Sequence, residues 1–264
     1  YRKWRIQMVK GLYTAYTGMI NEQNRMDNMT NNLANASTVG YKKEGSTSQS
    51  FDDVLTVKIK DQSVGMRNVQ RLGVKNPGVK IGENYTDYSQ GSFRITGNTY
   101  DLALSGEGFF AIEFTNKAGA TDTKYTRAGQ FTLNKDGYLV TEEGDYVLDT
   151  QNRRIRLNTL IDSSITDDGT IYQNGQAVAK IQVTDFEDYD YLEKYGETYY
   201  QPIQGAKTIA AKAQVKSGYL EMANVQIVSE MVNLISITRA YESNQKVVQT
   251  IDDTLDVAVN QIGR

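Results

Sequence analysis

The chain has 264 residues, with 29 Lys and Arg against 32 Asp and Glu, and it contains neither His nor Cys. Without His and Cys, Ser-His-Asp and Cys-His nucleophiles, Cys/His zinc sites and disulfides are all excluded. The net charge of −3 argues against a nucleic-acid binder, because such proteins carry a basic face. A hydrophobic content of 39% predicts a folded core. We expect no cofactor, no metal site, no small-molecule substrate and no nucleic-acid partner.

The first predicted element is a helix over residues 10–35. We interpret Met8 as the natural start and residues 1–7 as a non-native or upstream extension. No cleaved signal peptide is expected, because no continuous apolar segment follows Met8. Within the helix, one apolar position recurs every seven residues, which predicts packing against another helix. These positions are Leu12, Met19, Met26 and Leu33.

A row of Asn side chains accompanies this apolar seam. Its members step by three and four residues: Asn21, Asn24, Asn28, Asn31 and Asn35. Asn is a poor helix former, because its side chain competes for local backbone groups. The row is therefore either a solvated polar face or a set of hydrogen bonds that fixes register with neighbouring helices. The same two interpretations stay open for Gln23 and Gln245.

Residues 44–84 predict an extended linker with possible short strands, including one over 54–59. Pro77 and the glycines at 73, 78 and 82 exclude a helix there. Residues 85–213 then predict an antiparallel β domain, because alternating apolar residues are separated by turn sequences. Turns are expected at 134–137, 142–145 and 168–169, and at Asn174-Gly175, which suits a two-residue hairpin.

The last predicted helix runs over residues 220–262 within a C-terminal segment that we place at 214–264. Its heptad positions are Ile227, Met231, Leu234, Thr238, Tyr241, Gln245, Val248, Asp252, Leu255, Val259 and Ile262. At 1.5 Å per residue it measures about 64 Å, against about 39 Å for the first helix. We expect it to pair with the N-terminal segment, residues 8–43, and to overhang that partner by about 25 Å. Apolar surface on the overhang predicts packing against other molecules.

The predicted fold is therefore α+β. Long N- and C-terminal helices form a coiled-coil-like layer, and an antiparallel all-β domain is inserted between them.

Several segments resemble the bacterial flagellar basal-body rod and hook proteins. The N-terminal match runs through Asn32, Leu33, Ala34, Asn35, Gly40, Tyr41 and Lys42. Residues 90–91, 96–98 and 101–110 are similar to that family's entry into its β domain, and residues 125–131 and 136–140 are similar to the strand pair that follows. Residues 218–225, 230–235 and 239–246 are similar to its C-terminal helix motif. Length and the short β domain favour the distal-rod subunit, then a proximal-rod subunit, then the larger hook subunit.

The resemblance implies a structural subunit, not an enzyme, that polymerises around a hollow axis and transmits torque. It implies contacts with copies of itself, with other rod and hook proteins and with the flagellar export apparatus. It also implies a location in the basal body, outside the cytoplasmic membrane, reached without a cleaved signal peptide. The residues expected at subunit contacts are Leu12, Met19, Met26, Leu33, Met231, Leu234, Tyr241, Val248 and Leu255, with Asn24, Asn28, Asn31, Asn35, Gln23 and Gln245 as polar contacts.

Two other classes of protein are alternatives for this sequence. Glu107, Glu142, Glu143 and Asp145 could be misread as the carboxylate pair of a cell-wall glycosidase. They are expected at solvated turns between strands. A virus or phage tail-fibre subunit of trimeric build is the second alternative.

Overall fold

The structure is a computed structural model that describes residues 2–52, 54–58, 70–116 and 119–260. Two compact units share the chain. The helical unit contains the described residues up to Leu33, Glu44–Thr86 and those from Ile227 onward. The β unit contains Ala34–Lys43 and Asp87–Gln226. The α+β class predicted from the sequence is confirmed.

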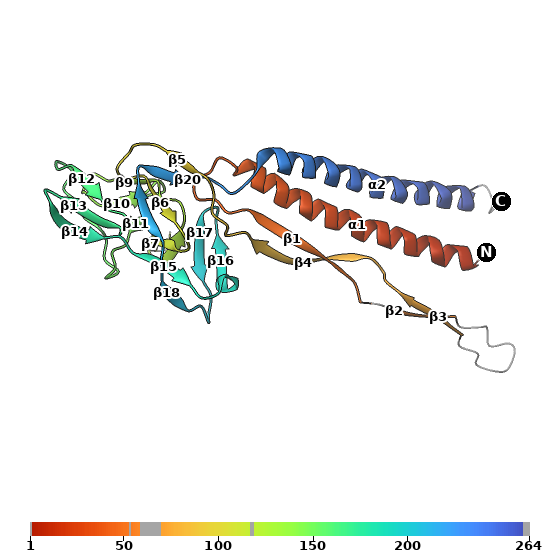
Figure 1. The fold of residues 1–264 in the computed structure, drawn as a ribbon. Helices are drawn as coiled ribbons and strands as arrows, with labels where there is room; N and C mark the ends of the chain where they lie inside the picture. The colour runs from red at the N-terminus through yellow and green to blue at the C-terminus, as the bar shows by residue number, and fades with distance from the viewer. Residues whose placement is uncertain (1, 53, 59–69, 117–118, 261–264) are drawn as a thin grey trace. The chain divides into compact units, whose positions relative to one another are not determined.

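Two helices of nearly equal length dominate the helical unit. Helix α1 spans Arg2–Ala34, 33 residues, and α2 spans Ile227–Asn260, 34 residues. They lie side by side and antiparallel (Figure 1). Gly11 faces Ile251 and Gly18 faces Asn244. Residues later in α1 therefore contact residues earlier in α2, as in an antiparallel pair. The predicted overhang of about 25 Å is wrong, because α1 begins earlier and α2 begins later than the heptad pattern indicated.

The later start of α2 has a clear cause. Residues Tyr219–Glu221 extend as strand β20 and pair with β5, Phe93–Ile95. Main-chain hydrogen bonds to another strand and a helical conformation exclude each other at these residues. Ile262 of the predicted helix lies outside the described residues, as does Tyr1 of the predicted extension.

The segment predicted as an extended linker with possible short strands contains two pairs of strands among its described residues, which we call the ribbon. Strand β1, Glu44–Ser50, pairs antiparallel with β4, Val79–Thr86, and β2, Val54–Lys58, pairs with β3, Gln70–Lys75. Ile59 of the predicted strand lies outside the described residues. The ribbon contacts α1, because Ser48 Oγ donates to Asn21 Oδ1 at 3.1 Å and Thr14 Oγ1 donates to the Pro77 carbonyl at 3.1 Å.

The β unit is built from antiparallel pairs. Its main sheet orders β16-β17-β8-β7-β11-β10-β9, and β15 pairs with both β7 and β18. These strands are β7 Phe109–Thr115, β8 Thr121–Thr126, β9 Phe131–Leu133, β10 Leu139–Thr141, β11 Tyr146–Val147, β15 Val183–Phe186, β16 Leu192–Tyr195, β17 Tyr199–Pro202 and β18 Thr208–Ala210. A smaller sheet orders β12 Ser163–Ile165, β13 Thr170–Gln173 and β14 Gln176–Lys180, and β6 Leu102–Ser105 pairs with β19 Gln214–Ser217. A short 3-10 helix covers Tyr189–Tyr191.

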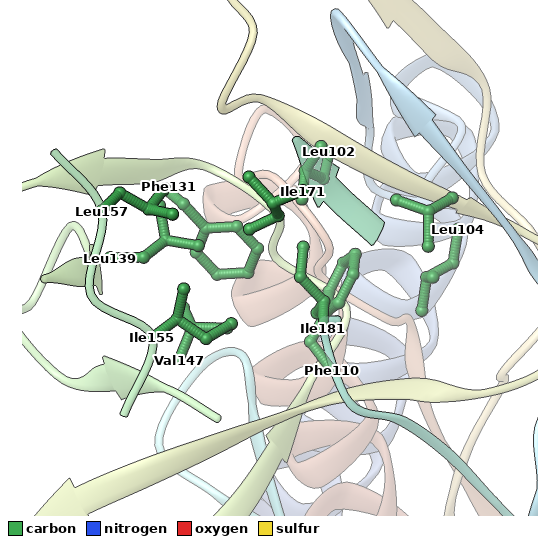
Figure 2. Close-up of a cluster of buried hydrophobic side chains, with 11 residues drawn as sticks. Leu102, Leu104, Phe110, Phe131, Leu139, Val147, Ile155, Leu157, Ile171 and Ile181 are labelled. Atoms are coloured by element: carbon green, nitrogen blue, oxygen red, sulfur yellow. The ribbon is translucent and has the colours of Figure 1, made fainter. Parts of the chain in front are cut away.

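The core of the β unit lies on both faces of strand β7. Phe110 packs in one cluster, with its ring 5.2 Å from that of Phe131 in an edge-on contact (Figure 2). Phe109 and Ala111 belong to a second cluster, with Tyr200 and Phe186. Residues 109–111 of β7 thus alternate between two apolar clusters, and all three are buried because both faces of the strand are covered.

The predicted turns are confirmed. Residues 134–137 connect β9 to β10, and residues 142–145 connect β10 to β11. Asn174 and Gly175 join β13 to β14 with φ angles of 50° and 75°, as a two-residue hairpin with two left-handed residues requires. The Asp168-Gly169 turn precedes β13.

Candidate assembly surface and buried ion cluster

One face of α2 packs against α1, and its least exposed positions define that face. Ile237 is 3% exposed, and the half-buried positions repeat around it with steps of three and four residues. They are Leu234, Tyr241, Asn244, Val248, Ile251 and Leu255, with Thr238 and Ala240 half-buried beside them and Glu230 buried one turn before Leu234. Four of the predicted heptad positions lie on this face: Leu234, Tyr241, Val248 and Leu255. Of the alternate positions, Thr238 is also half-buried, whereas Gln245 is exposed and its neighbour Asn244 is half-buried instead.

A second, outward face of α2 is apolar and exposed. It comprises Ile227, Val228, Met231, Val232 and Ile235, which are exposed by 49, 77, 49, 62 and 54%. Their spacing of one, three, one and three residues places them along one side of the first turns of a helix. We call these five residues the outer apolar face. Apolar patches of this kind mark sites of protein contact.

The other predicted contact residues divide between these environments. Leu12, Met19, Met26 and Leu33 of α1 are half-buried, and Thr238 Oγ1 lies 4.0 Å from Met26 Sδ. Met231 belongs to the outer apolar face. Gln23 and Gln245 are exposed, so neither is a buried register-setting residue within one molecule. Their role between molecules stays a prediction.

The Asn row has mixed partners within the chain. Asn24 Nδ2 donates to the Ile20 carbonyl at 2.9 Å, which is a local bond along α1. Asn35 is buried and its Oδ1 accepts from Thr38 Oγ1 at 3.1 Å. Asn28 is half-buried and Asn31 is exposed. The row is therefore neither a uniformly solvated face nor a single ladder of bonds within the molecule.

Asn32, outside the row, has the most specific contact on α1. It is fully buried, and it exchanges two hydrogen bonds with the backbone of Glu44, 2.7 Å from Nδ2 to the carbonyl and 2.9 Å from the amide to Oδ1. The carboxamide thereby makes the two hydrogen bonds that the backbone of a neighbouring strand would make. These bonds hold the start of β1 against α1. The sequence pattern gave Asn32 no such role.

A buried ion cluster lies in the β unit. Glu221 is 0% exposed, and its Oε1 accepts from Lys42 Nζ at 2.7 Å and from the Gly91 amide at 2.9 Å. Its Oε2 accepts from Arg127 Nη1 at 3.2 Å. Lys42 Nζ also donates to the Ser89 carbonyl at 2.7 Å. Burial lowers the pKa of Lys42, and the adjacent Glu221 carboxylate opposes that shift.

The sequence places Lys42 in a family motif but predicts no contact for its side chain. It predicts no role for Glu221 or Arg127. One signal was present: Glu221 stands between two apolar residues, Leu220 and Met222. A charge in such a position is buried only with a partner. Which residues become partners depends on tertiary pairing, because Lys42 and Glu221 are separated by 179 positions.

The acidic turn between β10 and β11 surrounds one tyrosine hydroxyl. Tyr199 Oη lies 2.9 Å from Glu143 Oε2, 2.9 Å from Asp145 Oδ2 and 3.1 Å from Thr141 Oγ1. Burial raises the pKa of Asp145, with a further contribution from Glu143, while the hydrogen bond from Tyr199 opposes it. Glu142 and Glu143 are exposed. They line a cavity of about 290 Å³ together with Thr141 and Tyr199.

Two further properties concern only the described residues. No helix among them combines the length and the apolar character needed to cross a membrane. In the same part of the chain, no group of three or more acidic side chains is arranged to hold a metal ion.

Three family models match the chain. "Flagella basal body rod protein" matches residues 12–42, "Flagellar hook protein FlgE/F/G D1 domain" matches 103–175, and "Flagellar basal body rod FlgEFG protein C-terminal" matches 216–262. The first and last regions contain Lys42 and Glu221.

Curated relatives extend the similarity to nearly the whole chain. The chain is 34% identical to the flagellar basal-body rod protein FlgG of Bacillus subtilis, over 96% of this chain and 99% of that protein. It is 31% identical to the flagellar hook-basal body complex protein FlhO of Bacillus subtilis, over 97% and 100%. It is 30% identical to the flagellar basal-body rod protein FlgF of Caulobacter vibrioides, over 97% and 99%.

Proposed function

We propose that copies of this chain, which belongs to the flagellar basal-body rod and hook protein family, polymerise into a hollow helical shaft. As a structural subunit of the rod, the chain would transmit torque along this shaft. The outer apolar face of α2 carries the proposal. Its five side chains are each between 49 and 77% exposed on a helix whose opposite face already packs on α1. A helix with two apolar faces requires a second partner.

The occupant of the outer apolar face is an α-helix of a neighbouring subunit. A contact between two different surfaces of identical subunits repeats without closing, and it builds a filament. The resulting helices form a coiled-coil-like layer in which close packing resists bending. In this layer, residues that are half-exposed in one molecule, such as Leu12 and Met19, become buried between molecules.

The finer assignment is the distal part of the rod. It is supported by the higher identity to the FlgG relative, 34%, than to the FlgF relative, 30%. The alternatives are a proximal-rod subunit or a hook subunit. We further propose that the subunit contacts other rod and hook proteins. Under this proposal it reaches the basal body, outside the cytoplasmic membrane, through the flagellar export apparatus without a cleaved signal peptide.

We also propose that the chain has no catalytic activity. The glycosidase alternative needs substrate between two carboxyl groups. Instead, the Tyr199 hydroxyl lies within 2.9 Å of both Glu143 and Asp145 and occupies the space between them. Incubation with peptidoglycan should release no soluble fragments, and the alanine variants at 142, 143 and 145 should behave identically.

Electron microscopy of concentrated protein tests the assembly. We expect tubes from the native chain and none from Val232→Asp, which places a charge in the outer apolar face. Asn233→Asp is the matched control, because Asn233 is an exposed polar neighbour on the same helix, and it should form tubes. Tubes from Val232→Asp would contradict the proposal, and a discrete trimer from the native chain would favour the tail-fibre class.

A further inference from the structure

Two segments of the β unit that are far apart in the sequence are joined through their backbones. Residues 38–43 follow α1 in the chain, and residues 219–224 come shortly before α2. The Gly40 amide donates to the Glu221 carbonyl at 2.8 Å. Val39 and Met222 form an antiparallel bridge. The Lys43 amide donates to Asn224 Oδ1 at 2.8 Å. We call these two segments together the clasp.

The charges of the clasp make its two segments unequal. Lys42 and Arg127 are 1 and 3% exposed and share one carboxylate, that of Glu221. If residues 219–224 left their place, these two buried cations would lose the carboxylate that they share. Removing one partner from a buried ion pair typically costs about 3–5 kcal/mol. Lys42 would be driven into water together with the segment that carries it.

The reverse displacement is also unfavourable. If residues 38–43 left, Glu221 would keep Arg127 but lose the 2.7 Å contact with Lys42. Its backbone carbonyl would lose the Gly40 amide. The Asn224 carboxamide, which also donates to the Asp87 carbonyl at 2.7 Å, would lose the Lys43 amide. Buried polar groups without partners cost free energy, so each departure favours the other.

We propose that the carboxylate of Glu221 makes the ordering of residues 38–43 and of residues 219–224 a single cooperative event. The segment that follows α1 therefore cannot fold before the chain has been completed as far as residue 224. This coupling is a property of the β unit and does not depend on whether the protein polymerises.

Hydrogen exchange of the full chain tests the coupling at two amides. The Gly40 amide bonds across the clasp, whereas the Met222 amide donates to the Ser92 carbonyl at 2.9 Å and makes no bond to residues 38–43. In Lys42→Met, which keeps the stem but removes the charge, we expect both amides to exchange at least about tenfold faster. Lys135→Met, at an exposed lysine of the same unit, should change neither.

Faster exchange at Gly40 with an unchanged rate at Met222 would overturn the proposal, because a purely local loosening has that signature. Amides of the core strand β10 report whether the β unit stays folded. Asn224→Ala is the milder variant for the case in which Lys42→Met loses that core protection. It removes hydrogen bonds from the other segment, and it should raise exchange at Gly40 about fivefold. No change at Gly40 in Asn224→Ala would equally overturn the coupling.

Discussion

Lys42 Nζ lies 2.7 Å from Glu221 Oε1, and both side chains are withdrawn from water. Glu221→Gln keeps the shape of the side chain but leaves Lys42 and Arg127 as buried cations. We expect the free energy of unfolding of the β unit to fall by about 3 kcal/mol. Urea titration followed by near-ultraviolet circular dichroism measures it. A loss below about 1 kcal/mol would mean that water reaches these cations, and the exposed Glu142→Gln is the control.

Two isoleucines that stand two positions apart lie on different faces of α2. Substitution of each by Asp should therefore affect a different property, tube formation for one and stability for the other. Ile235 is 54% exposed and Ile237 is 3% exposed. Ile235→Asp should leave the helical content of the subunit unchanged and abolish tube formation. Ile237→Asp should lower the thermal midpoint of the helical unit, because it buries an unpaired charge in the contact with α1. Circular dichroism and electron microscopy on the same preparations separate the two outcomes.

The control for Ile235→Asp is Ser236→Asp, which adds the same charge at an exposed polar position. If Ser236→Asp also abolished tubes, added charge on α2 and not the apolar face would explain the effect. If Ile235→Asp unfolded the helix, the assignment of Ile235 to an outward face would be wrong.

Two glycines of α1 face α2 with different amounts of free space. Larger side chains at these two positions should therefore change the stability of the helical unit to different extents. A Cβ added at Gly11 would lie 3.7 Å from Ile251 Cδ1, an ordinary van der Waals distance. A Cβ added at Gly18 would lie 3.1 Å from Asn244 Nδ2, which is tight. We expect Gly11→Ala to stabilise the helical unit by up to about 1 kcal/mol through helix propensity. Gly18→Leu should destabilise it by about 1–3 kcal/mol through overpacking. Equal effects of the two variants in thermal unfolding would contradict this contact register.

The sequence predicted elements best where a local pattern determines them. Asn174-Gly175 specifies its hairpin because both residues tolerate a left-handed conformation. Leu234, Tyr241, Val248 and Leu255 were assigned to a helix-packing seam because apolar residues recur there every seven positions. At Met231 and Gln245 the less exposed residue is instead the one before, Glu230 or Asn244. Met231 and Ile237 are equally apolar, and only the orientation toward α1 distinguishes them.

Features that depend on distant segments could not be read from the pattern. The start of α2 was placed at Leu220 because its apolar side chain fits a helix. The backbone of that residue is instead paired with Arg94 of β5. The short strand predicted over 54–59 corresponds to β2, Val54–Lys58, but β1 was not predicted because it is polar, with the sequence EGSTSQS, and lacks the alternation of a half-buried strand. The ion cluster was missed because its members come from four separate segments.

Gly40 predicts a severe effect from the smallest possible substitution. Its φ of +70° is left-handed, and an added Cβ would lie 2.2 Å from the Ala128 backbone nitrogen. Gly40→Ala therefore combines backbone strain with a clash against main chain that cannot rotate away. We expect residues 38–43 to lose their hydrogen-exchange protection and the β unit to lose at least about 2 kcal/mol. Gly144→Ala also has a positive φ, +97°, but meets nothing within 4 Å, so it should cost about 1 kcal/mol. Equal losses would show that the close approach to Ala128 is unimportant.

Asp145 predicts a change in how stability depends on pH. Because burial raises the pKa of its carboxyl group, the folded state holds the proton to a higher pH than the unfolded state does. Between the ordinary value, about 3.9, and the raised value, the folded state binds more protons, so stability falls as pH rises. Asp145→Asn cannot ionise and escapes this loss. It should be more stable than the native β unit at pH 7, by less than about 1 kcal/mol, and the two should converge near pH 3.

Urea titrations at several pH values between 3 and 7 measure this difference. The Tyr199 hydroxyl retains Glu143 as an acceptor at 2.9 Å in the variant, so its pairing is not the source of the effect. Asp136→Asn, at the exposed turn between β9 and β10, is the matched control and should follow the native curve. If Asp145→Asn lost stability at pH 7, the attraction of the Asp145 carboxylate to Lys124 and its hydrogen bond from Tyr199 would outweigh its burial. The sign of the pH dependence between pH 4 and 6 would then be reversed.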